Sequence, residues 1–204
     1  MKKTVLSSLA LAASSTIAFA SAGLFDSFAI VNTTGDQFYD AGATTGLPDF
    51  QGTDLGDFEA GTDTLQLGGQ TKTFKNSSSD VTGASLFYRI WSGSESGSFS
   101  ELSYAFQIND VGGTPGDQQW GTDASGINAS AFYTADLISG LSAGDYTLEV
   151  YTRITTNGVD APAEMFANNG GANYEATFTV VPEPGSFALL AGLSGLAFLA
   201  LRRR

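Results

Sequence analysis

The sequence predicts an all-β fold: a single antiparallel β-sandwich of about seven or eight strands. Its middle part contains several stretches in which large apolar and polar residues alternate, the period of a half-buried strand. Clusters of Gly, Asp and Asn separate these stretches, as turns do. An apolar segment stands near each terminus, so we expect a signal-peptide helix before the sandwich and a transmembrane helix after it.

The clearest alternation runs through residues 101–110, 145–156 and 173–181, and each of these stretches predicts a strand with one polar face. Residues 84–91 (ASLFYRIW) carry large side chains on both faces, which is typical of a central strand covered on each side. Residues 26–32 form a further candidate strand. In residues 64–74 we expect two short strands joined by a hairpin turn at Gly68-Gly69.

A short pattern before the most regular strand resembles immunoglobulin-like and fibronectin-like domains. In "GLSAGDYTLEVYTRI", Leu141, Gly144 and Tyr146 stand where a loop enters the strand. The resemblance implies a sheet-corner tyrosine whose hydroxyl binds nearby backbone. It favours a sandwich over a barrel and says nothing about function.

The N-terminal segment has the pattern of a secretory signal peptide. Lys2 and Lys3 precede an apolar and small-residue stretch over residues 5–19. Small residues follow, with expected cleavage after Ala20 or Ala22. We therefore assign residues 1–22 to a signal peptide and expect export through the Sec translocon.

The C-terminal segment combines three features over residues 181–204. Val181, Pro182, Glu183 and Pro184 come first, and the prolines favour extended backbone before them. A helix from Pro184 to Leu201 would be roughly 27 Å long at about 1.5 Å per residue, close to the ~30 Å hydrocarbon core of a bilayer. The basic residues that follow are expected to stay cytoplasmic: Arg202, Arg203 and Arg204.

A signal peptide combined with this tail resembles the PEP-CTERM proteins. The resemblance implies that the tail is a sorting signal processed near Pro-Glu-Pro by an exosortase, a membrane transpeptidase-like enzyme of Gram-negative bacteria that make exopolysaccharide. It implies membrane attachment through the C-terminal helix before processing, and a final place in the cell envelope, at the surface or outside the cell. The remaining residues, 23–180, form the predicted ectodomain.

Composition narrows the possible functions of the ectodomain. Twenty acidic side chains stand against four basic ones, a net charge of −16, which excludes nucleic acid as an expected partner. The chain has neither histidine nor cysteine. Nucleophilic triads and histidine-ligated zinc are therefore absent, and we expect no catalysis and no obligatory cofactor.

Two acidic stretches are candidate calcium sites, because calcium binds carboxylate and carbonyl oxygens on flexible loops. The alternative is that both stretches form solvated turns that bind no ion. The candidate ligands are Asp54, Asp57, Glu59, Asp110, Asp117 and Asp123.

Trp120 stands among polar residues in the second acidic stretch. Its ring is expected either to stack on a sugar or to fold back and cap the end of the sandwich. Trp91 and exposed tyrosines are further candidates for sugar stacking.

The sequence favours a structural or adhesive surface protein linked to exopolysaccharide. An acidic ectodomain would bind such a polymer either by contacting neutral sugar units or through a divalent ion that bridges carboxylates of the protein and the polymer. The alternative is a carbohydrate-binding module, marked by two or more coplanar exposed aromatic rings on one face. A secreted glycoside hydrolase is a weaker alternative, since its most prominent carboxylate, Glu149, is expected to pair with Arg153 as a solvated ion pair.

Overall fold

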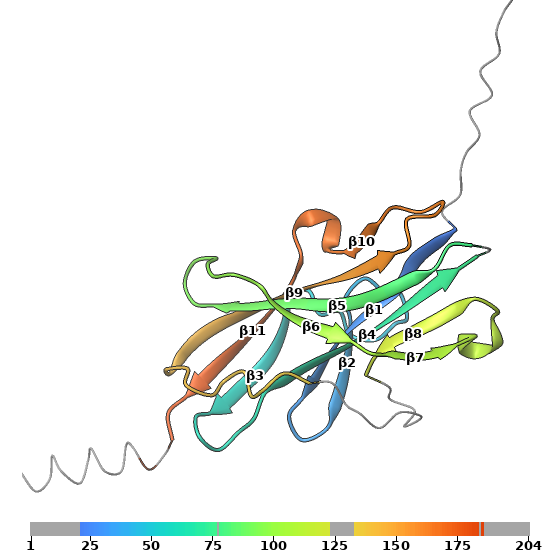
Figure 1. The fold of residues 1–204 in the computed structure, drawn as a ribbon. Coiled ribbons are helices and arrows are strands. Elements are labelled where there is room, and N and C mark those ends of the chain that lie inside the picture. Colours follow the sequence, from blue (N-terminus) through green and yellow to red (C-terminus); the bar gives the residue numbers. More distant parts are fainter. Residues whose placement is uncertain (1–20, 77, 123–132, 184, 186–204) are drawn as a thin grey trace, which may run out of the picture.

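In a computed structural model, the protein forms two packed β-sheets (Figure 1). The structure describes residues 21–76, 78–122, 133–183 and 185. The first sheet has the strand order β2 (Asp36–Asp40), β1 (Ala22–Asn32), β4 (Gln66–Lys75), β8 (Asp117–Gly121) and β7 (Phe106–Asn109). The second has the order β3 (Thr53–Glu59), β11 (Tyr174–Val181), β9 (Gly144–Thr156), β5 (Val81–Trp91) and β6 (Ser100–Tyr104), with β10 (Glu164–Ala167) paired to β9. Two short 3-10 turns, η1 (Val111–Gly113) and η2 (Asn169–Gly171), lie in loops.

The predicted all-β sandwich is confirmed, but with eleven strands among the described residues rather than seven or eight. It is also not wholly antiparallel, because β3 pairs with β11 in parallel. Short segments such as β2 and β10 add strands, because they are too short to show a clear alternation in sequence. The single strand predicted over residues 101–110 is wrong: it divides into β6 in the second sheet and β7 in the first, where Phe106 and Ile108 are exposed.

Inward-facing apolar side chains, which alternate with outward-facing residues along β9, form the centre of the core. Leu148, Val150 and Ile154 are fully buried between the sheets, while Tyr151 and Arg153 alternate with them on the outer face. The central strand predicted over residues 84–91 is confirmed as β5, which pairs with β9 over almost its whole length.

The predicted hairpin turn at Gly68-Gly69 is wrong, because both glycines lie inside the continuous strand β4. A Cβ added at Gly68 would lie 2.6 Å from the ring of Tyr133, and one at Gly69 would overlap the hydroxyl of Tyr104. The glycines therefore let two aromatic side chains pack directly on the strand, a recognised use of glycine within a sheet.

A bulge in β3 changes the direction of its acidic side chains. The register between β3 and β11 shifts between Thr177 and Thr179, next to Gly56, whose φ is 97°. Asp54 pairs with Thr177 and Asp57 with Thr179, so the two aspartates share one face although they are three residues apart. In a regular strand this spacing would put them on opposite faces.

The strands that lead to the two ends of the chain lie at opposite ends of the sandwich (Figure 1). β1 begins at Ala22 beside Lys75, and β11 ends at Val181 beside Glu59. The predicted signal-peptide helix and the predicted C-terminal membrane helix fall outside the described residues. Within the described part, no helix is long and apolar enough to cross a membrane.

Candidate functional site

The predicted sorting motif begins where the sheet ends. Val181 is the last residue of β11, and its carbonyl accepts a hydrogen bond of 2.9 Å from the Ala60 amide. Pro182 lacks the N–H that a further ladder position would need, and Pro182 and Glu183 are exposed. The Glu183 side chain lies over Gly61, in the turn after β3. Pro184 and Arg202, Arg203 and Arg204 lie outside the described residues.

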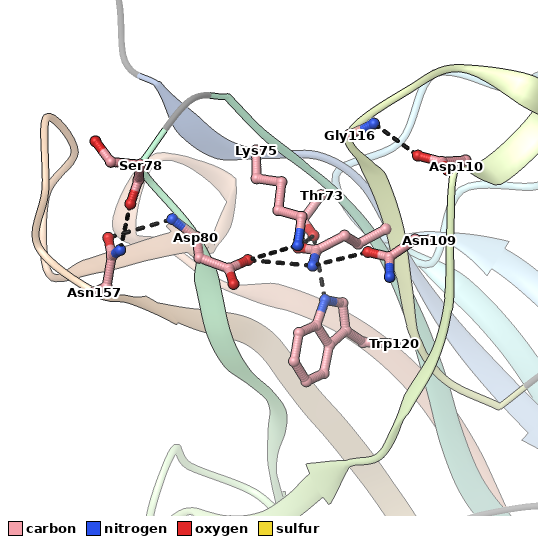
Figure 2. A network of polar contacts seen from close by, with 10 residues as sticks. Thr73, Lys75, Ser78, Asp80, Asn109, Asp110, Gly116, Trp120 and Asn157 are labelled. Atoms are coloured by element: carbon pink, nitrogen blue, oxygen red, sulfur yellow. Dashed lines mark hydrogen bonds and ion pairs between the residues drawn. The ribbon is translucent and has the colours of Figure 1, made fainter.

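Trp120 lies in strand β8 and not on a polar loop, which corrects the sequence prediction. Its side chain is only 8 % exposed and points between the sheets, where its indole N–H donates to the Thr73 hydroxyl at 3.2 Å. Figure 2 shows how Thr73 continues into a polar network that reaches Asn109 and Asp80. The ring is thus a core side chain that offers little surface to a glycan.

The predicted calcium ligands are not gathered into a site. Asp54, Asp57 and Glu59 lie in strand β3, and Asp110 and Asp117 flank a separate loop at the other end of the sandwich. Asp110 there accepts the Gly116 amide at 2.9 Å and closes the loop on itself (Figure 2). Asp123 lies outside the described residues. Across the described ranges, no three acidic side chains lie close enough together to hold a metal ion.

A buried carboxylate on the outer face of the second sheet accepts three hydrogen bonds. Glu149 is 2 % exposed. Its Oε2 accepts from Arg89 Nε at 2.7 Å and from Trp91 Nε1 at 3.3 Å, and its Oε1 accepts from Asn173 Nδ2 at 2.6 Å. Arg89 also pairs with Glu95, from the loop between β5 and β6.

These contacts set the electrostatics of the cluster. Burial alone would raise the pKa of Glu149, but the hydrogen bonds from Arg89 and Asn173, together with the Arg89 charge, bring that pKa below its ordinary value. Glu149 is therefore an ionised, structural carboxylate. The expected pairing with Arg153 is wrong, because Arg153 pairs with Glu101 at 3.3 Å and Glu164 at 3.4 Å.

Next to this cluster, the outer face carries a stack of aromatic rings. Phe87 and Tyr151 are cross-strand neighbours with ring planes 4° apart and centroids separated by 4.8 Å. The Arg153 guanidinium lies over Phe87, 4.6 Å from its centroid. These rings are parallel but stacked on one another and half-buried, so they do not form the side-by-side exposed platform expected of a carbohydrate-binding module.

A shallow hollow of about 320 Å³ lies on the same outer face, towards the end at which β11 leads into the tail. The half-buried indole of Trp91 lines it. Register places Trp91 beside Thr147, Thr147 beside Thr177, and Thr177 beside Asp54, in one row across β5, β9, β11 and β3. The sequence indicates Trp91 as a candidate for sugar stacking and Asp54 as a candidate calcium ligand, but it does not place them together, because the row depends on pairings between strands far apart in sequence.

The predicted corner tyrosine has the expected hydrogen bond. The Tyr146 hydroxyl donates to the Ser142 carbonyl, four residues upstream, at 2.8 Å. Its ring is half-buried and stacks on Phe178, with centroids 5.4 Å apart. The corner is therefore present, and the closer likeness to an immunoglobulin domain stays a prediction.

Comparison with known proteins bears on the C-terminal tail. Residues 180–204 match the PEP-CTERM protein-sorting motif. No curated protein matches the chain. The motif implies processing by an exosortase and export to the cell envelope, surface or extracellular space. The chain thus joins a folded β-sandwich, without an intervening linker, to a PEP-CTERM sorting tail.

Proposed function

We propose that the protein is a non-catalytic structural or adhesive protein of the cell surface or extracellular matrix, associated with exopolysaccharide. In this proposal the Sec translocon exports the chain, the C-terminal helix holds it in the membrane, and an exosortase then processes the tail. The sorting motif at residues 180–204 supports the proposal, because it implies that the adjoining β-sandwich is exported to the cell envelope, surface or extracellular space.

Two features support a role without chemistry. The chain contains no histidine and no cysteine, so the commonest general base and the thiol nucleophile are missing. Glu149, the least exposed carboxylate among the described residues, is held ionised by Arg89 and Asn173 rather than poised as an acid. A glycosidase would instead need two accessible carboxyl groups on either side of a bound sugar.

The charge of the ectodomain restricts which class of polysaccharide it can bind. With twenty acidic and four basic side chains, the domain would be repelled by an anionic glycan. Because the described acidic side chains do not gather into a metal site, a neutral sugar is the better-supported partner than an ion-bridged acidic one.

The test is fractionation of the native host, comparing a strain that makes exopolysaccharide with one that does not. The proposal expects the protein in the matrix fraction of the first strain and in the culture medium of the second. Adding a chelator is expected to leave matrix retention unchanged. Equal distribution of the protein in both strains would refute the link to the polymer.

A further inference from the structure

The hollow lined by Trp91 combines the two kinds of surface that a sugar needs. A pyranose ring has an apolar face, which stacks on an indole, and a rim of hydroxyl groups, which donate and accept hydrogen bonds. Trp91 supplies the aromatic surface, and Thr147, Thr177 and Asp54 supply the polar groups in the same row. The volume, about 320 Å³, lies at the lower end of the range for small-ligand sites.

The polar groups of the row are available to a ligand. Within the described residues, the hydroxyls of Thr147 and Thr177 form no hydrogen bond with another side chain or with backbone. Asp54 is exposed and uses Oδ1 to accept the Gly56 amide at 2.9 Å. A ligand hydroxyl can therefore bind here without displacing an internal contact of the protein.

The aromatic side chain is held in place by the buried cluster behind it. Trp91 Nε1 donates to Glu149, which is itself fixed by Arg89 and Asn173. A ring anchored in this way loses little conformational freedom when a ligand stacks on it, which favours binding.

The charges around the hollow select the class of sugar. Asp54 and Asp145 line it, and none of the described residues that line it is basic. The nearest guanidinium in the cluster, on Arg89, is already paired with Glu149 and Glu95. A uronate or a phosphorylated sugar would face uncompensated carboxylates, whereas the hydroxyls of a neutral sugar can donate to them.

We propose that the row Trp91–Thr147–Thr177–Asp54 is a binding subsite for a neutral hexose unit of a polysaccharide. The proposal rests on the proposed function for the source of the glycan and adds the site and the sugar class. Trp91 provides stacking, and the threonine hydroxyls and the Asp54 carboxylate bind the sugar hydroxyls.

The test uses the full-length protein in a zwitterionic detergent, because detergents with sugar headgroups would compete. The Trp120→Phe variant leaves Trp91 as the single tryptophan, so its fluorescence reports on the hollow. The probes are cellohexaose, maltohexaose and mannohexaose, with hexagalacturonate as the anionic counterpart. At least one neutral probe is expected to shift the Trp91 emission, and hexagalacturonate is expected to leave it unchanged.

Isothermal titration of variants then locates the site. Trp91→Ala is expected to weaken binding of the neutral probe at least about tenfold. Thr177→Val, at an exposed position without a side-chain partner, should weaken binding while leaving the melting temperature unchanged. The matched control is Phe166→Ala, which removes a 47 % exposed aromatic side chain elsewhere on the molecule and should not alter binding.

The proposal is overturned if no neutral probe binds, if both Trp91→Ala and Thr177→Val bind like the parent protein, or if hexagalacturonate binds more tightly than the neutral probes. Failure here is separable from failure of the proposed function. A protein retained in the native matrix equally with and without Trp91 would contradict the subsite alone. A protein that binds the probes through Trp91 but never enters the matrix would contradict the proposed function alone.

Discussion

Arg89 and Glu149 form a charge pair between β5 and β9, with Arg89 Nε 2.7 Å from Glu149 Oε2 and side chains that are 13 % and 3 % exposed. Replacing Glu149 with Gln leaves the guanidinium without its main countercharge. Breaking a buried ion pair at one partner costs about 3–5 kcal/mol of unfolding free energy. The measurement is urea unfolding, with Glu175→Gln as the matched control at the neighbouring position of β11. An equal effect of the two substitutions would show that the pair contributes nothing specific.

The same pair makes stability depend on pH. The folded-state pKa of Glu149 is lowered, so its contribution is present above the unfolded value of about 4.3 and is lost as pH falls through the lower folded value. Unfolding free energy should therefore decrease as the pH falls below about 5. The Glu149→Gln variant should show a shallower decrease. A pH profile that is identical in the two proteins would contradict the structural role of this carboxylate.

Gly69 should not accept a side chain. A Cβ there would overlap the hydroxyl of Tyr104, which is only 6 % exposed and cannot move into solvent. Gly69→Ala is expected to lower the unfolding free energy by about 1–3 kcal/mol, the usual cost of overpacking. Gly35→Ala is the control, since nothing lies within 4 Å of its Cβ position. Thermal melting that ranks the two variants equally would contradict the packing of Tyr104 on β4.

Two substitutions at Tyr146 separate the contribution of its ring to unfolding free energy from that of its hydroxyl. Because the bond to the Ser142 carbonyl is exposed, Tyr146→Phe should cost about 0.5–1 kcal/mol, at the weak end for a hydrogen bond. Tyr146→Ala also removes the stacking on Phe178, and at this half-buried site we expect about 1.5–3 kcal/mol. Chemical denaturation measures both. A loss below about 0.5 kcal/mol for the alanine variant would show that the corner is dispensable.

Signal-peptide cleavage is expected after Ala20 rather than after Ala22. Ala22 is fully buried and pairs with Lys75, and the Ser21 amide donates to the Asp160 carbonyl at 3.2 Å. Cleavage after Ala22 would remove these contacts from the first strand. N-terminal sequencing of the exported protein should therefore begin at Ser21. A mature chain that begins at Gly23 would refute the expected site.

Alternating sequence patterns predicted the β-sandwich because each pattern depends on burial along a single strand. The alternation of β9 and the two-sided apolar pattern of β5 each follow from burial along one strand, and both were predictable. The Gly68-Gly69 turn was wrong because the need for these glycines comes from Tyr104 and Tyr133, which are distant in sequence. A two-residue glycine turn and a glycine contact site look the same in sequence.

The candidate site depended on pairings that sequence spacing does not reveal. Glu149 has Arg153 four residues away on its own strand face, but its partner is Arg89, directly opposite on β5. Trp120 stands among polar residues because its neighbours on β8 face outward or join the network around Thr73. The sorting tail was recognisable, since its features are consecutive in the chain.

The most direct measurement for the central claim is mass spectrometry of the C-terminus of the protein from surface and extracellular fractions of its native host. We expect a mature chain that ends near Pro182–Pro184 in cells with an active exosortase. In cells without the enzyme we expect a chain that keeps the apolar segment and Arg204. A surface-exposed chain that still ends at Arg204 in cells with active exosortase would contradict the central claim.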